Sequence, residues 1–304
     1  MAVPDVSGDD RIVVFGDVID DIVVVPSGPI RTDTDTPASI RHCPGGSAAN
    51  VAAWLGSLGA PVDFVGVVGE GDLARHCALM RGGGIRPLLG AHRTLPTGAI
   101  VVLVDGERRS MLTERGANAS LDPRSVTDEL LDAAGLLHLS GYNVMDSADP
   151  VALRNLIARA VERGVDISVD PGSAGNLADF GAKRFLDAIS GARLLFPNLE
   201  EGRVLTGASD PELVAMSLAR RFSVVALTLG RDGVVVASGD STTRVAAVSA
   251  SITDPTGAGD AFCAGFLASW MRDRDAVSAA NAGVRLAAGA VAVSGGRPVS
   301  PIGA

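Results

Sequence analysis

Asp260 lies in a turn of small residues that opens a helical pattern. Residues 254–260 read DPTGAGD, and Phe262, Phe266 and Trp270 follow at the four-residue spacing of one helix face. The first N–H groups of a helix lack a partner within the helix and attract anions, and glycine lets an oxyanion come close. A carboxylate inside such an anion site suggests a general base for a hydroxyl that attacks phosphorus. The local pattern also fits a plain loop in which Asp260 complements the helix dipole.

A second group of polar residues follows the predicted strand 11–16. It consists of the three carboxylates Asp17, Asp20 and Asp21. Ligands of open α/β sheets bind outside the carboxyl ends of strands, so these residues are expected at the edge of a site. A solvated acidic turn is the alternative. Asn50, early in a buried apolar helix, fits either a hydrogen bond in the cap region or a ligand contact.

Short apolar runs alternate with helical patterns along most of the chain. Repeated β-α units with short connections predict a mostly parallel sheet covered by helices on both faces. The predicted strands are 11–16, 62–69, 135–140, 166–171, 194–198, 223–230 and 234–236. The predicted helices are 48–58, 73–81, 151–163 and 199–205, and residues 231–233 form a hairpin turn.

Two β-rich excursions interrupt this alternation, at about 22–43 and 93–116. In the second, two β-like runs flank Asp105-Gly106, which is a hairpin signal. We expect these excursions to form a small β lid beside the main sheet. Because no break in composition marks a second unit, residues 1–304 are expected to form a single domain.

Charge and composition exclude several classes of function. The net charge is −9 and no basic block offsets it, which disfavours nucleic-acid or anionic-membrane partners. Lys183 is the only lysine, so chemistry that needs an active-site lysine is disfavoured. Three cysteines without C-x-x-C spacing indicate neither a disulfide framework nor a zinc site. The polar segment 1–10 and the lack of a long apolar run make the cytoplasm the expected location.

Several common catalytic motifs do not occur in the chain. It has no G-x-x-x-x-G-K-[ST] phosphate loop, no G-x-S-x-G and no H-E-x-x-H. The nearest dinucleotide fingerprint is residues 69–74, GEGDLA, whose acidic residues would face a pyrophosphate. A dinucleotide-dependent oxidoreductase is therefore disfavoured.

Two widely separated motifs, GGSAANVA at 45–52 and DPTGAGDAF at 254–262, resemble the two signatures of the ribokinase-like (PfkB) carbohydrate kinase family. Three further elements occur in the family's order, namely residues 16–21, the N-x-x-E at 198–201 and TLGRDG at 228–233. The resemblance covers nearly the whole chain and implies a three-layer α/β ribokinase-like fold with a small β lid. Residues 69–74 depart from the family's G-D-D-x-x-G element, which affects the expected substrate more than the reaction.

The resemblance assigns a role to each matching residue. Asp260 matches the catalytic base, and the amides of Gly257, Ala258 and Gly259 match the anion hole for the transferring phosphoryl group. The residues that match the sugar-binding positions are Asp21, Gly45, Gly46 and Asn50. Carboxylates and carboxamides suit a polyol because its hydroxyls both donate and accept hydrogen bonds.

The family's cofactors are ATP, Mg²⁺ and, in some members, K⁺. Asn198 and Glu201 match the motif that orders Mg²⁺ and the phosphates through water. The residues that match the nucleotide-binding positions are Asn198, Thr228, Gly230 and Gly233. Asp254 and the carbonyl of Thr256 match the monovalent-cation site.

The expected function is transfer of the γ-phosphoryl group of ATP to a hydroxymethyl group of a small sugar. A nucleoside kinase of the same fold is the alternative, disfavoured because nucleoside sites supply aromatic faces and only 4% of this chain is aromatic. A non-catalytic sugar- or nucleotide-binding regulator is the alternative from another class, and a base at Asp260 argues against it. In several family members the lid pairs between subunits, so a homodimer through the lid is also expected.

Overall fold

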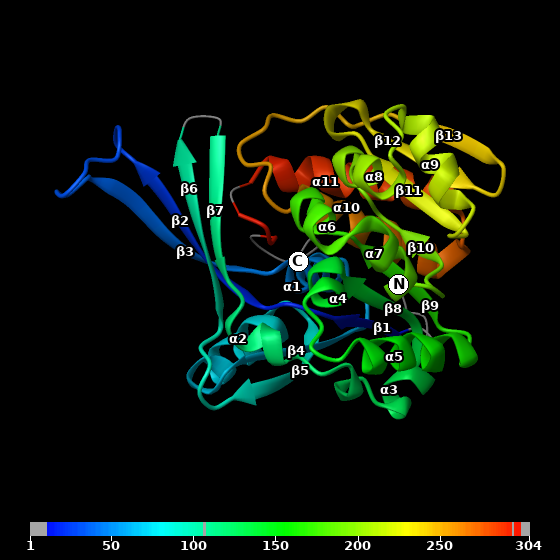
Figure 1. Cartoon of the computed structure of the whole chain (residues 1–304), viewed down its shortest axis with the longest axis horizontal. Helices are drawn as coiled ribbons and strands as arrows, with labels where there is room; N and C mark the ends of the chain where they lie inside the picture. Colours follow the sequence, from blue (N-terminus) through cyan, green and yellow to red (C-terminus); the bar gives the residue numbers. More distant parts are fainter. Residues whose placement is uncertain (1–10, 106–107, 294, 299–304) are drawn as a thin grey trace, which may run out of the picture.

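The computed structural model describes residues 11–105, 108–293 and 295–298. A nine-stranded sheet runs through the molecule in the order β13-β12-β11-β10-β9-β8-β1-β4-β5 (Figure 1). All of its pairs are parallel except β11–β12 and β12–β13. The strands are β1 Arg11–Phe15, β4 Val62–Gly69, β5 Ile85–His92, β8 Ala134–Ser140, β9 Asp166–Asp170, β10 Leu194–Leu195, β11 Val224–Thr228, β12 Val234–Ser238 and β13 Ser241–Val245. The predicted mostly parallel sheet is confirmed.

Helices cover both faces of this sheet because its strands bury side chains on both sides. In β1, Val13 and Phe15 pack into one core, and Ile12 and Val14 pack into the other. The first core takes side chains from α3 Asp128–Asp132, α4 Gly141–Met145, α5 Pro150–Glu162, α6 Ala174–Phe180, α7 Ala182–Ala188, α8 Leu199–Thr206 and α9 Pro211–Ala219. The second takes them from α1 Ser47–Ser57, α2 Leu73–Gly82, α10 Ala258–Asp273 and α11 Ala276–Val291.

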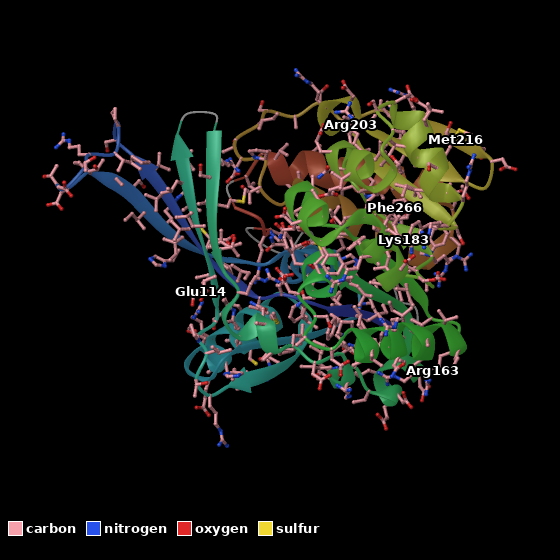
Figure 2. The ribbon with its side chains drawn as sticks, in the orientation of Figure 1. Glu114, Arg163, Lys183, Arg203, Met216 and Phe266 are labelled. Atoms are coloured by element: carbon pink, nitrogen blue, oxygen red, sulfur yellow. The ribbon has the colours of Figure 1, made fainter. Side chains whose placement is uncertain are left out.

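The aromatic stripe predicted on α10 lies in the second core. Phe266 is fully buried and stacks on Trp270 with ring centroids 6.2 Å apart. It also meets Phe196 edge to face at 4.9 Å. Figure 2 labels Phe266 together with Lys183 and Arg203, whose side chains are exposed. This packing fixes the helix whose first turn carries Asp260.

A separate four-stranded sheet, here called the small sheet, has the order β3-β2-β6-β7. Its strands are β2 Ile19–Pro26, β3 Ala38–Gly45, β6 Gly98–Asp105 and β7 Arg108–Glu114. It extends to one side of the main body in Figure 1. The antiparallel pairing of β6 and β7 confirms the predicted hairpin strands, while Gly106 of the predicted turn lies outside the described residues. The role of this sheet as a lid stays a prediction.

Sequence reasoning missed several elements, among them β5, β13 and α11. β5 contains Pro87 and Gly90, which disfavour a central strand but are tolerated at a sheet edge, where β5 lies. β13, at the opposite edge, is short and mostly exposed, so it carries no apolar alternation. The predicted helix 48–58 is found one residue earlier, as α1. Among the described residues, no helix has the length and apolarity needed to cross a membrane.

Candidate active site

The first turn of α10 has the geometry of an anion site. Gly257 precedes the helix with φ 76°, and a Cβ there would lie 2.6 Å from the Cα of Gly296, so only glycine fits. A Cβ at Gly259 would instead meet open space. Within the described residues the amides of Gly257 and Gly259 have no protein acceptor, whereas the amide of Ala258 donates to the carbonyl of Pro255 at 3.3 Å. Two of the three predicted amides are therefore available to an oxyanion.

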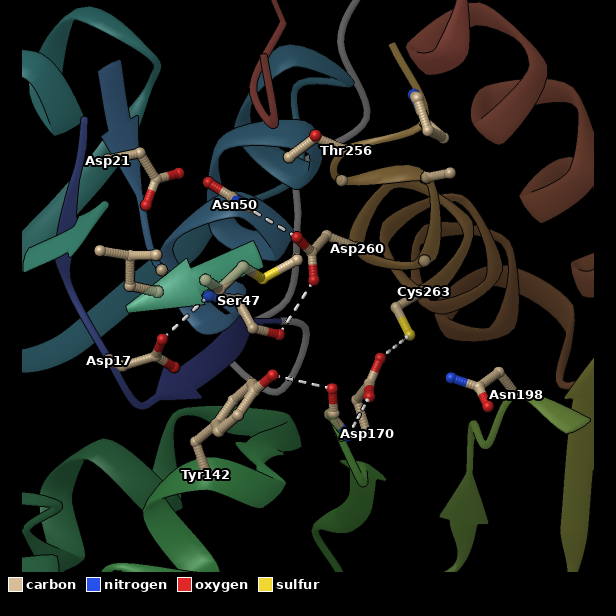
Figure 3. A pocket seen from close by; sticks show the side chains of 18 of the residues that line it. Asp17, Asp21, Ser47, Asn50, Tyr142, Asp170, Asn198, Thr256, Asp260 and Cys263 are labelled. Carbon is tan, nitrogen blue, oxygen red and sulfur yellow. Dashed lines mark hydrogen bonds between the residues drawn. The ribbon is translucent and has the colours of Figure 1, made fainter. Parts of the chain in front are cut away.

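The carboxylate of Asp260 is held between two residues of α1 (Figure 3). Ser47 Oγ donates to Asp260 Oδ1, and Asn50 Nδ2 donates to Asp260 Oδ2, each at 2.9 Å. Burial and the nearby charge of Asp170 raise the pKa of Asp260 to about 7, although these two hydrogen bonds act in the opposite direction. A carboxylate whose pKa lies near neutrality suits a general base.

The acidic segment after β1 divides into three carboxylates with different surroundings. Asp17 accepts hydrogen bonds from the amides of Ser47 and Ala48 and thereby caps α1. Asp20 pairs with Arg75 on α2, at 2.5 Å. Asp21 remains in the pocket, where burial raises its pKa to about 6 even though nearby Arg297 lowers it. Asp17 lines the same pocket, but both of its carboxylate oxygens accept hydrogen bonds from α1, so Asp21 is the more available of the two to a ligand.

Gly46 brings α1 close to the strand that follows β1. Its φ is 94°, and a Cβ there would lie 2.5 Å from the carbonyl oxygen of Asp17. The side chain of Asn50, one turn later, is held from two sides. Its carbonyl accepts from Arg297 Nε at 3.0 Å, while its amide donates to Asp260. These side-chain hydrogen bonds run to Asp260 and Arg297 and not to the cap of α1, so the cap-region interpretation of Asn50 is wrong, and its contact with a ligand stays a prediction.

Asn198 and Glu201 form a reciprocal capping box at the start of α8. The side chain of Asn198 accepts from the amide of Glu201, and the side chain of Glu201 accepts from the amide of Asn198, both at 2.9 Å. Glu201 nevertheless lines the pocket with Asp170. Burial raises the pKa of both carboxyls, and their mutual repulsion adds to the effect at Asp170.

These groups surround one pocket of about 390 Å³ that the small sheet helps to line. The predicted site residues that line it are Asp21, Gly46, Asn50, Asn198, Glu201, Thr228, Thr256, Gly257, Ala258, Gly259 and Asp260. Asp254 lines an adjoining pocket. Gly45 is not among the residues of either pocket, and Gly230 and Gly233 shape the turn between β11 and β12. The nucleotide role of these two glycines stays a prediction.

The pocket also contains residues that sequence reasoning missed. Ser47 holds the proposed base, and Asp170 accepts a hydrogen bond from Cys263 Sγ at 3.4 Å. The position of Asp170, at the carboxyl end of a predicted strand, was a usable signal. Arg109 and Arg297 reach the site through contacts across more than 140 residues of sequence. No local sequence pattern predicts these contacts of Arg109 and Arg297.

With this geometry in place, comparison with known proteins identifies the family. A model of the pfkB family carbohydrate kinases matches residues 9–302. The chain belongs to the pfkB family of carbohydrate kinases. This pfkB kinase is 32% identical over 270 residues to an ATP-dependent ribose-1-phosphate kinase of Halopiger xanaduensis, with 84% of this chain and 85% of the relative covered. It is 29% identical over 276 residues to a probable fructokinase of Arabidopsis thaliana, covering 86% and 70%.

Solved structures share the fold of this pfkB kinase. A probable sugar kinase of Rhizobium etli has a TM-score of 0.85 at 24% identity, with 97% of each chain covered. An adenosine kinase of Sinorhizobium meliloti has a TM-score of 0.83 at 25% identity, also with 97% of each chain covered. The predicted ribokinase-like α/β architecture is confirmed.

Proposed function

We propose that this pfkB kinase transfers the γ-phosphoryl group of ATP to a hydroxymethyl group of a small sugar. The observation that carries the proposal is the position of Asp260 beside the amides of Gly257 and Gly259. Asp260 takes the proton of the attacking hydroxyl, and the two amides stabilise the charge on the transferring phosphoryl group. Ser47 and Asn50 orient the carboxylate before the acceptor arrives.

The acceptor binds at the end of the pocket that contains Asp21. Asp21 accepts hydrogen bonds from its hydroxyls, and Asn50 contributes its second amide hydrogen. The small sheet lines this end with the aliphatic side chains of Ile100, Val102 and Met111. This aliphatic cover offers no aromatic face, so it suits a small sugar better than the nucleobase of a nucleoside. When the small sheet closes over the acceptor it excludes water, which is the role of a lid.

The relatives leave a nucleoside acceptor as the second candidate. Their names include a ribose-1-phosphate kinase, a fructokinase and an adenosine kinase, so the shared chemistry is phosphorylation of a sugar or of the sugar part of a nucleoside. The described pocket does contain Tyr142, but its hydroxyl is bound to the carbonyl of Gly172. Phe196 and Phe262 line the pocket as well, and these three aromatic side chains are the feature that favours the nucleoside alternative.

The donor set near α8 fits Mg²⁺ held through water. Among the described residues no group of three or more His, Cys, Asp or Glu side chains could hold a metal directly. Asp170 and Glu201, however, bring two buried carboxyls to the pocket, and a cation favours their charged forms. Asn198, Glu201 and Asp170 would hold the hydrated ion with the phosphates of ATP, and Mg²⁺ would neutralise charge on those phosphates.

The small sheet also supports a homodimer. In its register Val24 pairs with Ile40 and Val101 with Leu112, which places these four apolar side chains on the face opposite to Met111 and Arg109. Ile40 is 58% exposed and Leu112 is 61% exposed. A second copy of this chain would cover this apolar face, as expected when a lid pairs between subunits.

An assay of ADP release with Mg-ATP tests the proposed function. The acceptors are pentoses, pentose 1-phosphates, hexoses, keto-deoxy acids and nucleosides, and the variants are Asp260→Asn and Asp240→Asn. Asp240 is an exposed carboxylate in the turn between β12 and β13, so it is the matched control.

We expect turnover with at least one free or phosphorylated sugar, lost in Asp260→Asn and kept in Asp240→Asn. Turnover with nucleosides alone would support the second candidate. No turnover, with thermal stabilisation by ATP, would indicate a binding protein instead.

A further inference from the structure

Arg109 connects the small sheet to the loop that precedes the anion site. It lies on β7, 145 residues away from its partner Asp254 in the sequence. Its Nη2 atom donates to Asp254 Oδ1 at 2.9 Å, and its Nη1 atom donates to Thr256 Oγ1. The guanidinium therefore binds the side chains of Asp254 and Thr256, which lie in the loop just before Gly257. The amide of Gly257 belongs to the anion site.

The carboxylate of Asp254 accepts three hydrogen bonds. Oδ1 accepts from the amide of Thr256 at 2.9 Å as well as from Arg109, and Oδ2 accepts from the amide of Gly295 at 3.1 Å. Burial opposes ionisation of this carboxyl, but the hydrogen bonds outweigh it and lower the pKa of Asp254 to about 2. Asp254 thus stays ionised, and its counterion is the guanidinium of Arg109.

A monovalent cation fits this donor set poorly. Asp254 could offer it one free lone pair, on Oδ2, because hydrogen bonds already occupy the other three. The ion would also lie within a few ångströms of the Arg109 guanidinium, which carries the same charge. The side chain of Arg109 is 26% exposed and that of Asp254 17% exposed, so solvent screens this repulsion only in part.

We propose that Arg109 serves as a built-in cation for the loop 254–257, so that phosphoryl transfer in this enzyme does not require K⁺. Because Arg109 belongs to the small sheet, the same contact couples the position of that sheet to the order of the anion site. Arg109 is a positioning residue: it holds Asp254 and Thr256, and through them it holds the amide of Gly257 in place.

The shape of the guanidinium group explains why an arginine, and not a lysine, can hold this loop. A guanidinium is always charged and presents several donors in a fixed plane, so it can bind a carboxylate and a hydroxyl together. Lysine would supply the charge at one point only. Thr113 and Met111 share the face of β7 that carries Arg109 and line the same pocket, so this face looks toward the site.

The test compares wild type with the variants Arg109→Met and Arg109→Lys in KCl and in choline chloride of equal ionic strength. Arg31→Met is the matched control, because Arg31 is an exposed arginine in the connection between β2 and β3. The rates rest on the proposed function, whereas the melting temperature in each salt requires no acceptor. A failure of the proposed acceptor chemistry is therefore distinguishable from a failure of this inference.

We expect the wild-type rate and melting temperature to be the same in both salts. Arg109→Met should lose about tenfold or more of kcat in choline chloride. Added K⁺ should restore part of this rate and raise the melting temperature of this variant alone. Arg109→Lys should keep intermediate activity without K⁺.

A several-fold rise of the wild-type rate, or a higher wild-type melting temperature, in KCl would overturn the proposal. So would full activity of Arg109→Met in choline chloride. The wild-type comparison decides the matter even if a variant fails to fold.

Discussion

Asn50 Nδ2 donates a hydrogen bond to Asp260 Oδ2 at 2.9 Å, although 210 residues separate them in the sequence. The contact joins the first turns of α1 and α10, which belong to the two signature motifs of the family. Since α1 and α10 pack in one core, the proposed base Asp260 and its hydrogen-bond donor are held by the same layer of helices. The position of Asp260 thus depends on helix packing as well as on the loop that surrounds it.

Replacing Asn50 should raise the pKa of Asp260 as well as slow the reaction. The amide stabilises the charged carboxylate, so Asn50→Ala should move the acidic limb of the pH–rate profile to higher pH. Losing a hydrogen bond to a charged group should reduce kcat by about tenfold. Asn281→Ala is the control, because Asn281 is a partly exposed asparagine on α11 whose side chain donates to the carbonyl of Val277 and does not line the pocket. An unchanged acidic limb in Asn50→Ala would show that the contact does not tune the base.

Removing the charge of Asp260 should stabilise the protein at high pH. The pKa of this carboxyl is about 7 in the folded protein and near its ordinary value of 3.8 in the unfolded chain. The folded state therefore binds the proton more tightly, and stability falls as the pH rises from about 4 to about 7. Asp260→Asn should raise the free energy of unfolding by about 1–2 kcal/mol at pH 8 and by less at pH 5.

Urea denaturation at the two pH values measures this effect. Asp240→Asn should give equal changes at both, because Asp240 is an exposed carboxylate. If Asp260→Asn were destabilising by the same amount at pH 5 and pH 8, the carboxyl would not be a strained buried charge.

Arg297 should influence binding of the acceptor more than the chemical step. Its Nη2 atom donates to the carbonyl of Gly45 at 2.7 Å, and its Nε atom fixes the amide of Asn50. Arg297→Met should raise KM for the acceptor by about tenfold and leave KM for ATP unchanged. Steady-state kinetics beside Arg285→Met, an exposed arginine on α11, measures the difference. An equal rise in both KM values would instead indicate a general loss of structure.

The outer face of the small sheet should control the oligomeric state. Leu112→Glu places a charge on the apolar face formed with Ile40 and should convert a dimer to a monomer. Met216→Glu, on the exposed side of α9, is the control and should leave the mass unchanged. Light scattering after size-exclusion chromatography measures the molecular mass of each variant. A monomeric wild type would contradict the dimer.

The parts of the fold and site that local patterns encode could be predicted from the sequence. The buried strands β1 and β4 are apolar runs, and the stripe from Phe262 to Trp270 has helical spacing, so each carries its own signal. The edge strand β5 could not be predicted, because its place at the edge permits Pro87 and Gly90.

The long-range contacts of the site lie beyond local patterns. The motif at Asn198 and Glu201 has the spacing of a capping box, so sequence alone cannot separate its structural role from a role with Mg²⁺. The contacts of Arg109 and Arg297 depend on how distant segments meet, and an isolated arginine on a strand or near a terminus predicts neither. The resemblance to a family assigns residues that match its motifs and is silent on these two.

The most direct test of the central claim is the rate of a single phosphoryl transfer, measured from pH 5.5 to 9 with bound Mg-ATP and the preferred acceptor. The wild-type rate should fall below about pH 7 as Asp260 gains its proton. Asp260→Asn should be slower by about a thousandfold and independent of pH, with unchanged affinity for ATP. A variant that keeps the wild-type rate, or the same acidic limb, would contradict Asp260 as the base.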